Sequence, residues 1–231
     1  MFQGGPLNNT YLELFGATAQ LASPIPTAGL DNARTLEFMV DVMPTKFSTT
    51  QANLAFMGTY LACGWFEMDS PTTNTTDVAP VRFGVVRNAV DKYSGDGQVR
   101  LGRRTVLYGI DNGTNIFAWQ DGTALGSATS QADWTAAQKA RSIDIAAPFY
   151  FGFDDTVSKY TGLRIYELWI RVSGKTVLHY RPKLDMRGGT TIRDLSTFSN
   201  NGTVSGTENT DWALRAAWDK TTAYSGKETV G

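Results

Sequence analysis

Hydrophobic and polar residues alternate with a period of two along much of this chain. The clearest stretch is 36–42, where apolar Leu36, Phe38, Val40 and Val42 alternate with Glu37, Met39 and Asp41. Successive side chains of a strand point to opposite faces, so this stretch predicts a strand with one face in a core and one mostly polar face. Similar runs predict strands at 81–86, 99–110, 115–120, 149–153, 163–172, 176–180 and 203–205.

Turn signals separate these runs. Asn112-Gly113, Asp121-Gly122 and Ser173-Gly174 each stand between two of them, and such pairs are typical of tight β-hairpins. One segment, 133–141, has a capping residue followed by good helix formers, and it predicts a short helix in a loop. Turn signals recur about every 8–12 residues, as in β-sandwiches. We therefore predict an all-β fold with one short loop helix.

The chain length and composition fit a single domain. With 231 residues, 42% hydrophobic residues and 23 glycines, the chain can fill one sandwich core and its many turns. We expect the domain to span 11–218. We expect residues 1–10 to be a flexible N-terminal segment or the remnant of an expression tag, and 219–231 to be a polar C-terminal tail.

Charge and cysteine content exclude several classes of function. The formal net charge is −1, and Arg103-Arg104 is the only adjacent pair of basic residues, so nucleic acid is not an expected partner. No apolar run approaches the roughly 20 residues of a membrane-spanning helix. Cys63 is the only cysteine, so no internal disulfide can form.

Several segments resemble a known family. Tyr11-Leu12-Glu13-Leu14 and Arg34–Phe38 resemble the opening strands of laminin-G-like, concanavalin A-like domains. Phe117–Thr123 resembles their hairpin with an Asp-Gly turn, and Phe151-Gly152 is similar to their Ile-Gly strand. The resemblance implies two antiparallel sheets packed face to face as a jelly roll.

The last third of the chain carries the most specific part of the resemblance. Arg164–Ile170 is followed by Leu178–Pro182, Asp185 and then Asp194-Leu195. This order resembles a variant common in bacteriophage and prophage virion proteins. Members of the wider family bind sugars or proteins, build capsids or fibres, or hydrolyse glycans, and the fold alone does not decide among these.

Hydrolysis has a testable sequence requirement. The glucanase branch of the family uses Glu-x-Asp-x-x-Glu, and Glu67-Met68-Asp69 supplies its first half. Thr72 stands where the second glutamate would be, directly after Pro71, and glycosidases need two carboxylates. We therefore predict a protein that is not an enzyme.

Sugar binding would use exposed aromatic rings. The six tryptophans are Trp65, Trp119, Trp134, Trp169, Trp212 and Trp218. Trp65, Glu67 and Asp69 alternate, so they would share one face as a ring beside two hydrogen-bond acceptors, and Trp134 would be exposed in its loop. The alternative is that these tryptophans lie in the core, as most do in such sandwiches.

Calcium binding would use oxygen-rich turns. Asp111, Asn112 and Asn115 in one turn and Asp154 with Asp155 in another are the candidates. The same residues form ordinary Asx turns without any metal, so we expect no required cofactor, with calcium as an optional ligand. His179 has no second histidine, which argues against a transition metal.

The sequence thus favours a non-catalytic, lectin-like domain on a bacteriophage virion surface, as capsid decoration, head fibre or tail-associated protein. Its expected partners are a host-surface glycan or other virion subunits, including copies of itself. One alternative is a bacterial carbohydrate-binding module at the cell surface or outside the cell. The other is a glycoside hydrolase of the glucanase type.

Overall fold

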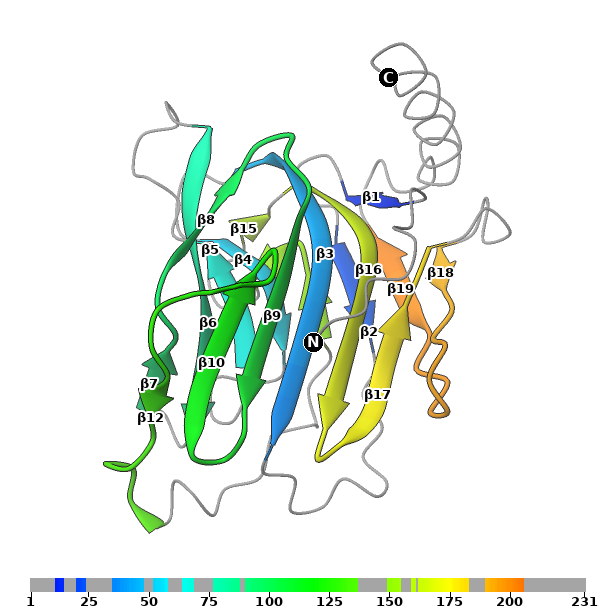
Figure 1. Cartoon of the computed structure of the whole chain (residues 1–231). Helices are drawn as coiled ribbons and strands as arrows, with labels where there is room; N and C mark the ends of the chain where they lie inside the picture. Colours follow the sequence, from blue (N-terminus) through cyan, green and yellow to red (C-terminus); the bar gives the residue numbers. More distant parts are fainter. Residues whose placement is uncertain are drawn as a thin grey trace.

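The computed structural model shows two antiparallel β-sheets packed face to face (Figure 1). It describes residues 11–14, 20–23, 35–47, 52–57, 64–68, 77–87, 90–136, 149–154, 159–160, 162–182 and 190–205. The two sheets confirm the predicted all-β sandwich. The expected terminal segments, 1–10 and 219–231, lie outside the described residues.

The front sheet contains the longest strands and faces the viewer in Figure 1. Its strand order is β1 (Leu12–Leu14), β16 (Gly162–Val172), β3 (Leu36–Lys46), β9 (Thr105–Asp111), β10 (Asn115–Gln120) and β11 (Thr123–Ala124). In addition, β12 (Thr129–Ser130) pairs with β10, and β17 (Lys175–Tyr180) pairs with β16.

The back sheet covers the other side of the core. Its order is β18 (Thr191–Ile192), β19 (Gly202–Ser205), β2 (Gln20–Ser23), β13 (Phe149–Phe151), β4 (Ala52–Met57), β5 (Gly64–Met68), β6 (Val78–Arg87) and β7 (Val90–Tyr93), and β8 (Gly97–Arg100) pairs with β6. A separate ribbon joins β14 (Phe153–Asp154) to β15 (Lys159–Tyr160).

Aromatic rings from both sheets meet in the core. The Phe38 ring of β3 lies 5.5 Å from that of Phe66 in β5 and 6.3 Å from that of Phe151 in β13, measured between centroids. Leu36, Phe38, Val40 and Val42 are all buried, which confirms the predicted inward face of β3. Burial of such side chains stabilises the fold by about 1.5–3 kcal/mol each.

The opposite face of β3 is less open than the alternation predicts. Met39 and Asp41 are each only 5% exposed: Arg104 donates two hydrogen bonds to Asp41, and Met39 lies in register between Tyr108 and Trp169.

The predicted single strand at 99–110 is wrong. Residues 97–100 form β8 in the back sheet, and residues 105–111 form β9 in the front sheet. The turn between them contains Gly102 with φ +71°, a conformation that glycine adopts without strain. Periodicity alone does not show that the chain crosses between sheets here.

All three predicted hairpins are confirmed, because β9 pairs with β10, β10 with β11 and β16 with β17, each antiparallel. Asp121 and Gly122 have φ of 51° and 82°, and Ser173 and Gly174 have φ of 46° and 77°. Positive φ at both central residues is the signature of the type I′ turn, whose twist matches that of the flanking strands. The predicted helix at 133–141 has a turn at its start and a helical residue at Ala136, and 137–148 lie outside the described residues. No helix in the described part of the chain is long and apolar enough to cross a membrane.

Candidate functional site

A row of large side chains crosses five adjacent strands on the outer face of the front sheet. The strand register places Trp119 of β10 opposite Tyr108 of β9, and Tyr108 opposite Met39 of β3. Met39 is in turn opposite Trp169 of β16, which is opposite His179 of β17. We call these five residues the aromatic row.

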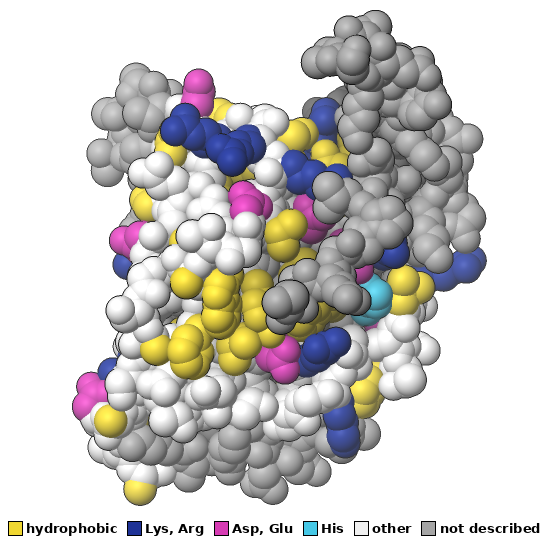
Figure 2. Space-filling model, in the orientation of Figure 1, with side chains coloured by type: hydrophobic (Ala, Val, Ile, Leu, Met, Phe, Trp, Pro, Cys, Tyr) yellow, Lys and Arg dark blue, Asp and Glu magenta, His cyan; other side chains and the backbone are white. Residues whose placement is uncertain are grey.

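The rings of the aromatic row pack against one another. The Tyr108 ring lies 5.4 Å from that of Trp119 and 5.6 Å from that of Trp169. Phe117 stacks on Trp119 at 5.9 Å with an interplanar angle of 17°. These four rings are half-buried, so part of each still reaches the surface. Figure 2 shows hydrophobic side chains gathered in the middle of this face.

An ion pair borders the aromatic row on one side. Glu37 and Arg171 are opposite each other on β3 and β16, with 3.7 Å between carboxylate and guanidinium. The Arg171 guanidinium lies 4.5 Å from the centre of the Trp169 ring, and the Tyr108 hydroxyl donates a 2.9 Å hydrogen bond to Glu37. Burial and this hydrogen bond raise the pKa of Tyr108, so the phenol stays a donor.

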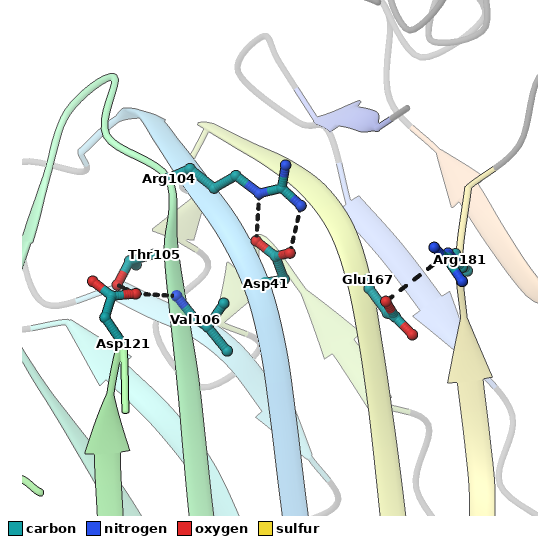
Figure 3. Close-up of polar contacts among 7 residues, drawn as sticks. All are labelled: Asp41, Arg104, Thr105, Val106, Asp121, Glu167 and Arg181. Atoms are coloured by element: carbon teal, nitrogen blue, oxygen red, sulfur yellow. Dashed lines mark hydrogen bonds and ion pairs between the residues drawn. The ribbon is translucent and has the colours of Figure 1, made fainter. Parts of the chain in front are cut away.

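A second charged row borders the aromatic row on the other side (Figure 3). Asp41 of β3 is opposite Glu167 of β16, and Arg104 donates two hydrogen bonds to Asp41, of 2.8 and 2.6 Å. The same guanidinium lies 3.8 Å from the centre of the Tyr166 ring. Burial raises the pKa of Asp41 despite these bonds.

Glu167 has an open and more polar environment than Asp41. His179 Nε2 lies 2.9 Å from its carboxylate, and Arg181 Nε lies 4.0 Å from it. The hydrogen bond with His179 is the main cause of a lowered pKa for Glu167. Both carboxylates are therefore engaged with cationic or proton-donating side chains.

A groove of about 630 Å³ extends the aromatic row at its His179 end. Side chains of β17 form one wall and the loop that follows Asp194 forms the other: Lys175, Thr176, His179, Leu195, Ser196, Thr197 and Phe198. Leu195 is 43% exposed there. The row and the groove together form one continuous candidate surface.

Asp194 holds the loop of this groove in place. Its carboxylate accepts hydrogen bonds from the backbone N–H groups of His179, Ser196 and Asn200, at 2.8, 2.9 and 2.7 Å, and from the Ser196 hydroxyl at 2.5 Å. Asn200 also donates from its side chain to the Val177 carbonyl. The loop thereby covers the outer edge of β17. Asp194, which belongs to the Asp194-Leu195 pair of the family resemblance, therefore has a structural role.

The predicted sugar site on β5 is not supported as an open acceptor surface. Glu67 is only 2% exposed, and it pairs with Arg82 of the neighbouring β6 at 3.4 Å. Arg82 in turn stacks over Tyr93 at 3.9 Å. The prediction that Glu67 is accessible is therefore wrong, because the Arg82–Tyr93 pair lies over it. The Trp65 side chain and Asp69 lie outside the described residues.

The predicted exposure of Trp134 is also wrong. Its side chain is 5% exposed and belongs to the hydrophobic core cluster. The turn at residues 131–134, closed by a hydrogen bond from Trp134 N–H to the Gln131 carbonyl, directs the ring inward. This is the core alternative that the sequence left open.

The predicted calcium loop has the geometry of an Asx turn. The Asn112 side-chain oxygen accepts hydrogen bonds from the N–H groups of Thr114 and Asn115, at 2.9 and 2.8 Å. Asp111 is buried and accepts from Gly113 N–H and the Gln131 amide. The described residues contain no group of three or more His, Cys, Asp or Glu side chains arranged to hold a metal. The Asp154 side chain and Asp155 lie outside them, so calcium at that turn stays a prediction.

The residues of the aromatic row were not singled out by sequence reasoning, although the signal was present. Trp169 stands between Leu168 and Ile170, and Trp119 follows Ala118. Leu168, Ile170 and Ala118 are buried. Within a strand, this alternation places both tryptophans on the outer face. The missing information was the register that aligns them with Tyr108 and Met39 of two other strands.

Comparisons with known proteins bear on the fold. No protein-family model matches the chain, and no curated protein matches it. Among solved structures, domains LG4–5 of the mouse laminin α1 chain align with a TM-score of 0.52 and 13% identity, over 79% of this chain and 46% of that one. This alignment confirms that the fold is a concanavalin A-like jelly roll.

Two further structures align less closely. The CBM40 module of a Ruminococcus gnavus sialidase, bound to α2,3-sialyllactose, has a TM-score of 0.44 and 9% identity, over 92% of this chain and all of that one (100%). The enzymatically active domain of bacteriophage CBA120 tailspike protein 2 has a TM-score of 0.45 and 7% identity, over 74% of this chain and 30% of that one. This chain spans less than half the length of the laminin fragment and less than a third of the tailspike domain.

Proposed function

We propose that this domain is a lectin-like binding module that holds a glycan on the aromatic row. The observation that carries the proposal is the alignment of Trp119, Tyr108 and Trp169 across the front sheet, with their rings 5.4–5.6 Å apart. Aromatic rings offer large apolar area with little conformational freedom to lose, which suits stacking against the apolar faces of sugars. The Glu37–Arg171 pair beside them supplies an acceptor and donors for sugar hydroxyls.

We propose further that the module does not catalyse hydrolysis. Asp41 and Glu167 are the carboxylates nearest to each other on this face by register. Asp41 is 5% exposed and held by two hydrogen bonds from Arg104, so it has no room to approach a scissile bond. The proposal is overturned if the protein releases reducing sugar from any polysaccharide and the release is lost in Glu167→Gln.

The setting we propose is a bacteriophage virion, where the module attaches the particle to a host-surface glycan or docks on neighbouring subunits. The support is the closing pattern from Arg164 to Leu195, which resembles virion proteins. Capsid and tail genes beside the coding gene would agree with this setting. Polysaccharide-utilisation genes in their place would favour a bacterial carbohydrate-binding module at the cell surface or outside the cell.

A glycan array followed by calorimetric titration tests the binding function. We expect the full chain to bind at least one array glycan and Trp119→Ala to weaken that binding about tenfold or more, as for central aromatic residues of other interfaces. Tyr150→Ala is the matched control, because Tyr150 is a half-buried aromatic residue of the back sheet whose neighbour Phe151 faces the core. Absence of binding to every array glycan, or equal losses in both variants, would refute the proposal.

A further inference from the structure

The charged side chains around the aromatic row occur as matched pairs. Arg104 pairs with Asp41 at 2.6 Å, and Arg164 with Glu13 at 3.3 Å. On the same face, Arg171 lies 3.7 Å from Glu37, and Arg181 lies 4.0 Å from Glu167. Each of these four pairs contains one positive and one negative charge and is neutral on its own, and Lys175 adds one more positive charge at the edge of the groove.

Three of the four arginines are also fixed by aromatic rings. Arg104 lies over Tyr166, Arg164 over Tyr11 and Arg171 over Trp169, at 3.8, 4.6 and 4.5 Å from the ring centres. Each guanidinium is therefore held between a carboxylate and a ring. An anionic ligand that contacts one of these guanidinium groups either lies beside the paired carboxylate, which repels it, or separates the pair, and a partly buried carboxylate left without its partner is costly.

An uncharged sugar does not have this cost. A guanidinium has five N–H donors and a carboxylate about four acceptor positions, so a pair retains hydrogen-bonding capacity after its members have met. The Glu37–Arg171 pair offers this capacity at the surface, where the side chains are 29% and 45% exposed. Neighbouring hydroxyls of a sugar ring can donate to the one and accept from the other.

The length of the aromatic row adds a second constraint. Adjacent strands lie about 4.8 Å apart, so the four intervals from Trp119 to His179 span about 19 Å. The groove at the His179 end continues this surface. A single sugar ring would leave most of it empty, whereas an extended oligosaccharide lying across the strands would contact several rings.

Building on the proposed glycan-binding function, we infer that the ligand is an uncharged, extended oligosaccharide read by the Glu37–Arg171 pair. Its binding should then depend little on salt, because ionic screening acts only on charged ligands. Glu37→Gln releases Arg171 from its carboxylate and makes the net charge of the face more positive by one. This variant should gain affinity for acidic glycans.

The test compares neutral and acidic oligosaccharides on the glycan array and then titrates the best ligand at low and high sodium chloride. For the wild type, we expect neutral oligosaccharides to bind best, with Kd changing less than about twofold between the two salt concentrations. Glu37→Gln should gain salt-sensitive binding of acidic glycans. Asp77→Asn makes the same charge change at an exposed position directly before β6 of the back sheet and should gain none.

Two results separate the possible failures. If the wild type prefers acidic glycans and loses about tenfold or more affinity at high salt, this inference is wrong and the proposed glycan-binding function stands. If neither neutral nor acidic glycans bind to the wild type, the proposed function itself fails, and the inference fails with it.

Discussion

Asp194 is the residue whose removal should most disturb the candidate surface. Its carboxylate satisfies the N–H groups of His179, Ser196 and Asn200, and Asp194 itself is 9% exposed. Asp194→Ala leaves these donors without an acceptor, so we expect unfolding free energy to fall by about 2–3 kcal/mol in urea denaturation. Asp194→Asn keeps one oxygen and should lose less. Equal stability of the alanine variant and the wild type would contradict this role.

Glu167 should contribute a pH-dependent part of the stability. Its pKa is lowered in the folded state, mainly by the hydrogen bond with His179, from the reference value of 4.5. The stabilisation is therefore present above pH 4.5 and is lost as pH falls below that value through the lowered pKa. Because the pair is partly exposed, we expect less than about 1 kcal/mol.

Denaturation of wild type and Glu167→Gln at a series of pH values measures this contribution. The difference between the two proteins should be largest at neutral pH and should shrink under acid. A difference that stays constant from pH 3 to pH 7, or that grows under acid, would show that the interaction with His179 does not lower the pKa.

At the scale of elements, the two sheets are fitted closely at Gly109. A Cβ atom on this residue of β9 would lie 2.5 Å from the Phe83 ring of β6. That ring is fully buried and packs on Phe66 at 5.1 Å, so it cannot move aside freely. We expect Gly109→Ala to cost about 1–3 kcal/mol, the usual range for overpacking a core.

A double variant distinguishes crowding from a general effect on the strand. Phe83→Leu shortens the opposing side chain, so the loss in Gly109→Ala/Phe83→Leu should be smaller than the sum of the two single losses. Additive losses in urea denaturation would mean that the ring contact is not the cause.

The sequence predicts elements well where one strand face is buried. The alternation in β3 and the type I′ turns at Asp121-Gly122 and Ser173-Gly174 follow from local chemistry, and the structure confirms them. The division of 99–110 between the two sheets does not follow from local chemistry. A strand has the same alternation of apolar and polar residues whichever sheet it joins.

The candidate site was harder to predict than the fold. Trp119 and Trp169 come together only through the register of β10, β9, β3 and β16, and register depends on contacts between distant segments. Local surroundings in the sequence point to Trp134 and Glu67, but tertiary packing buries both. An outward position in a strand was the better guide to a surface ring than a position in a loop.

At the scale of the whole molecule, the aromatic row lies on the front sheet between the Glu37–Arg171 ion pair and the charged row of Asp41, Arg104, Glu167 and Arg181, and Figure 3 shows this charged row. This arrangement makes the front sheet the expected binding face. On the described part of the back sheet, Arg82 pairs with the Glu67 carboxylate and covers it. The central claim is that a glycan lies on the aromatic row.

The indole N–H resonances of the six tryptophans test this claim most directly, because each gives a separate signal in a ¹⁵N-correlated NMR spectrum. The oligosaccharide found on the array is titrated into the full chain, with signals assigned from single Trp→Phe variants. If a glycan lies on the aromatic row, we expect saturable shifts of the Trp119 and Trp169 signals, with little change for buried Trp134. Unchanged Trp119 and Trp169 signals at saturating ligand would contradict it.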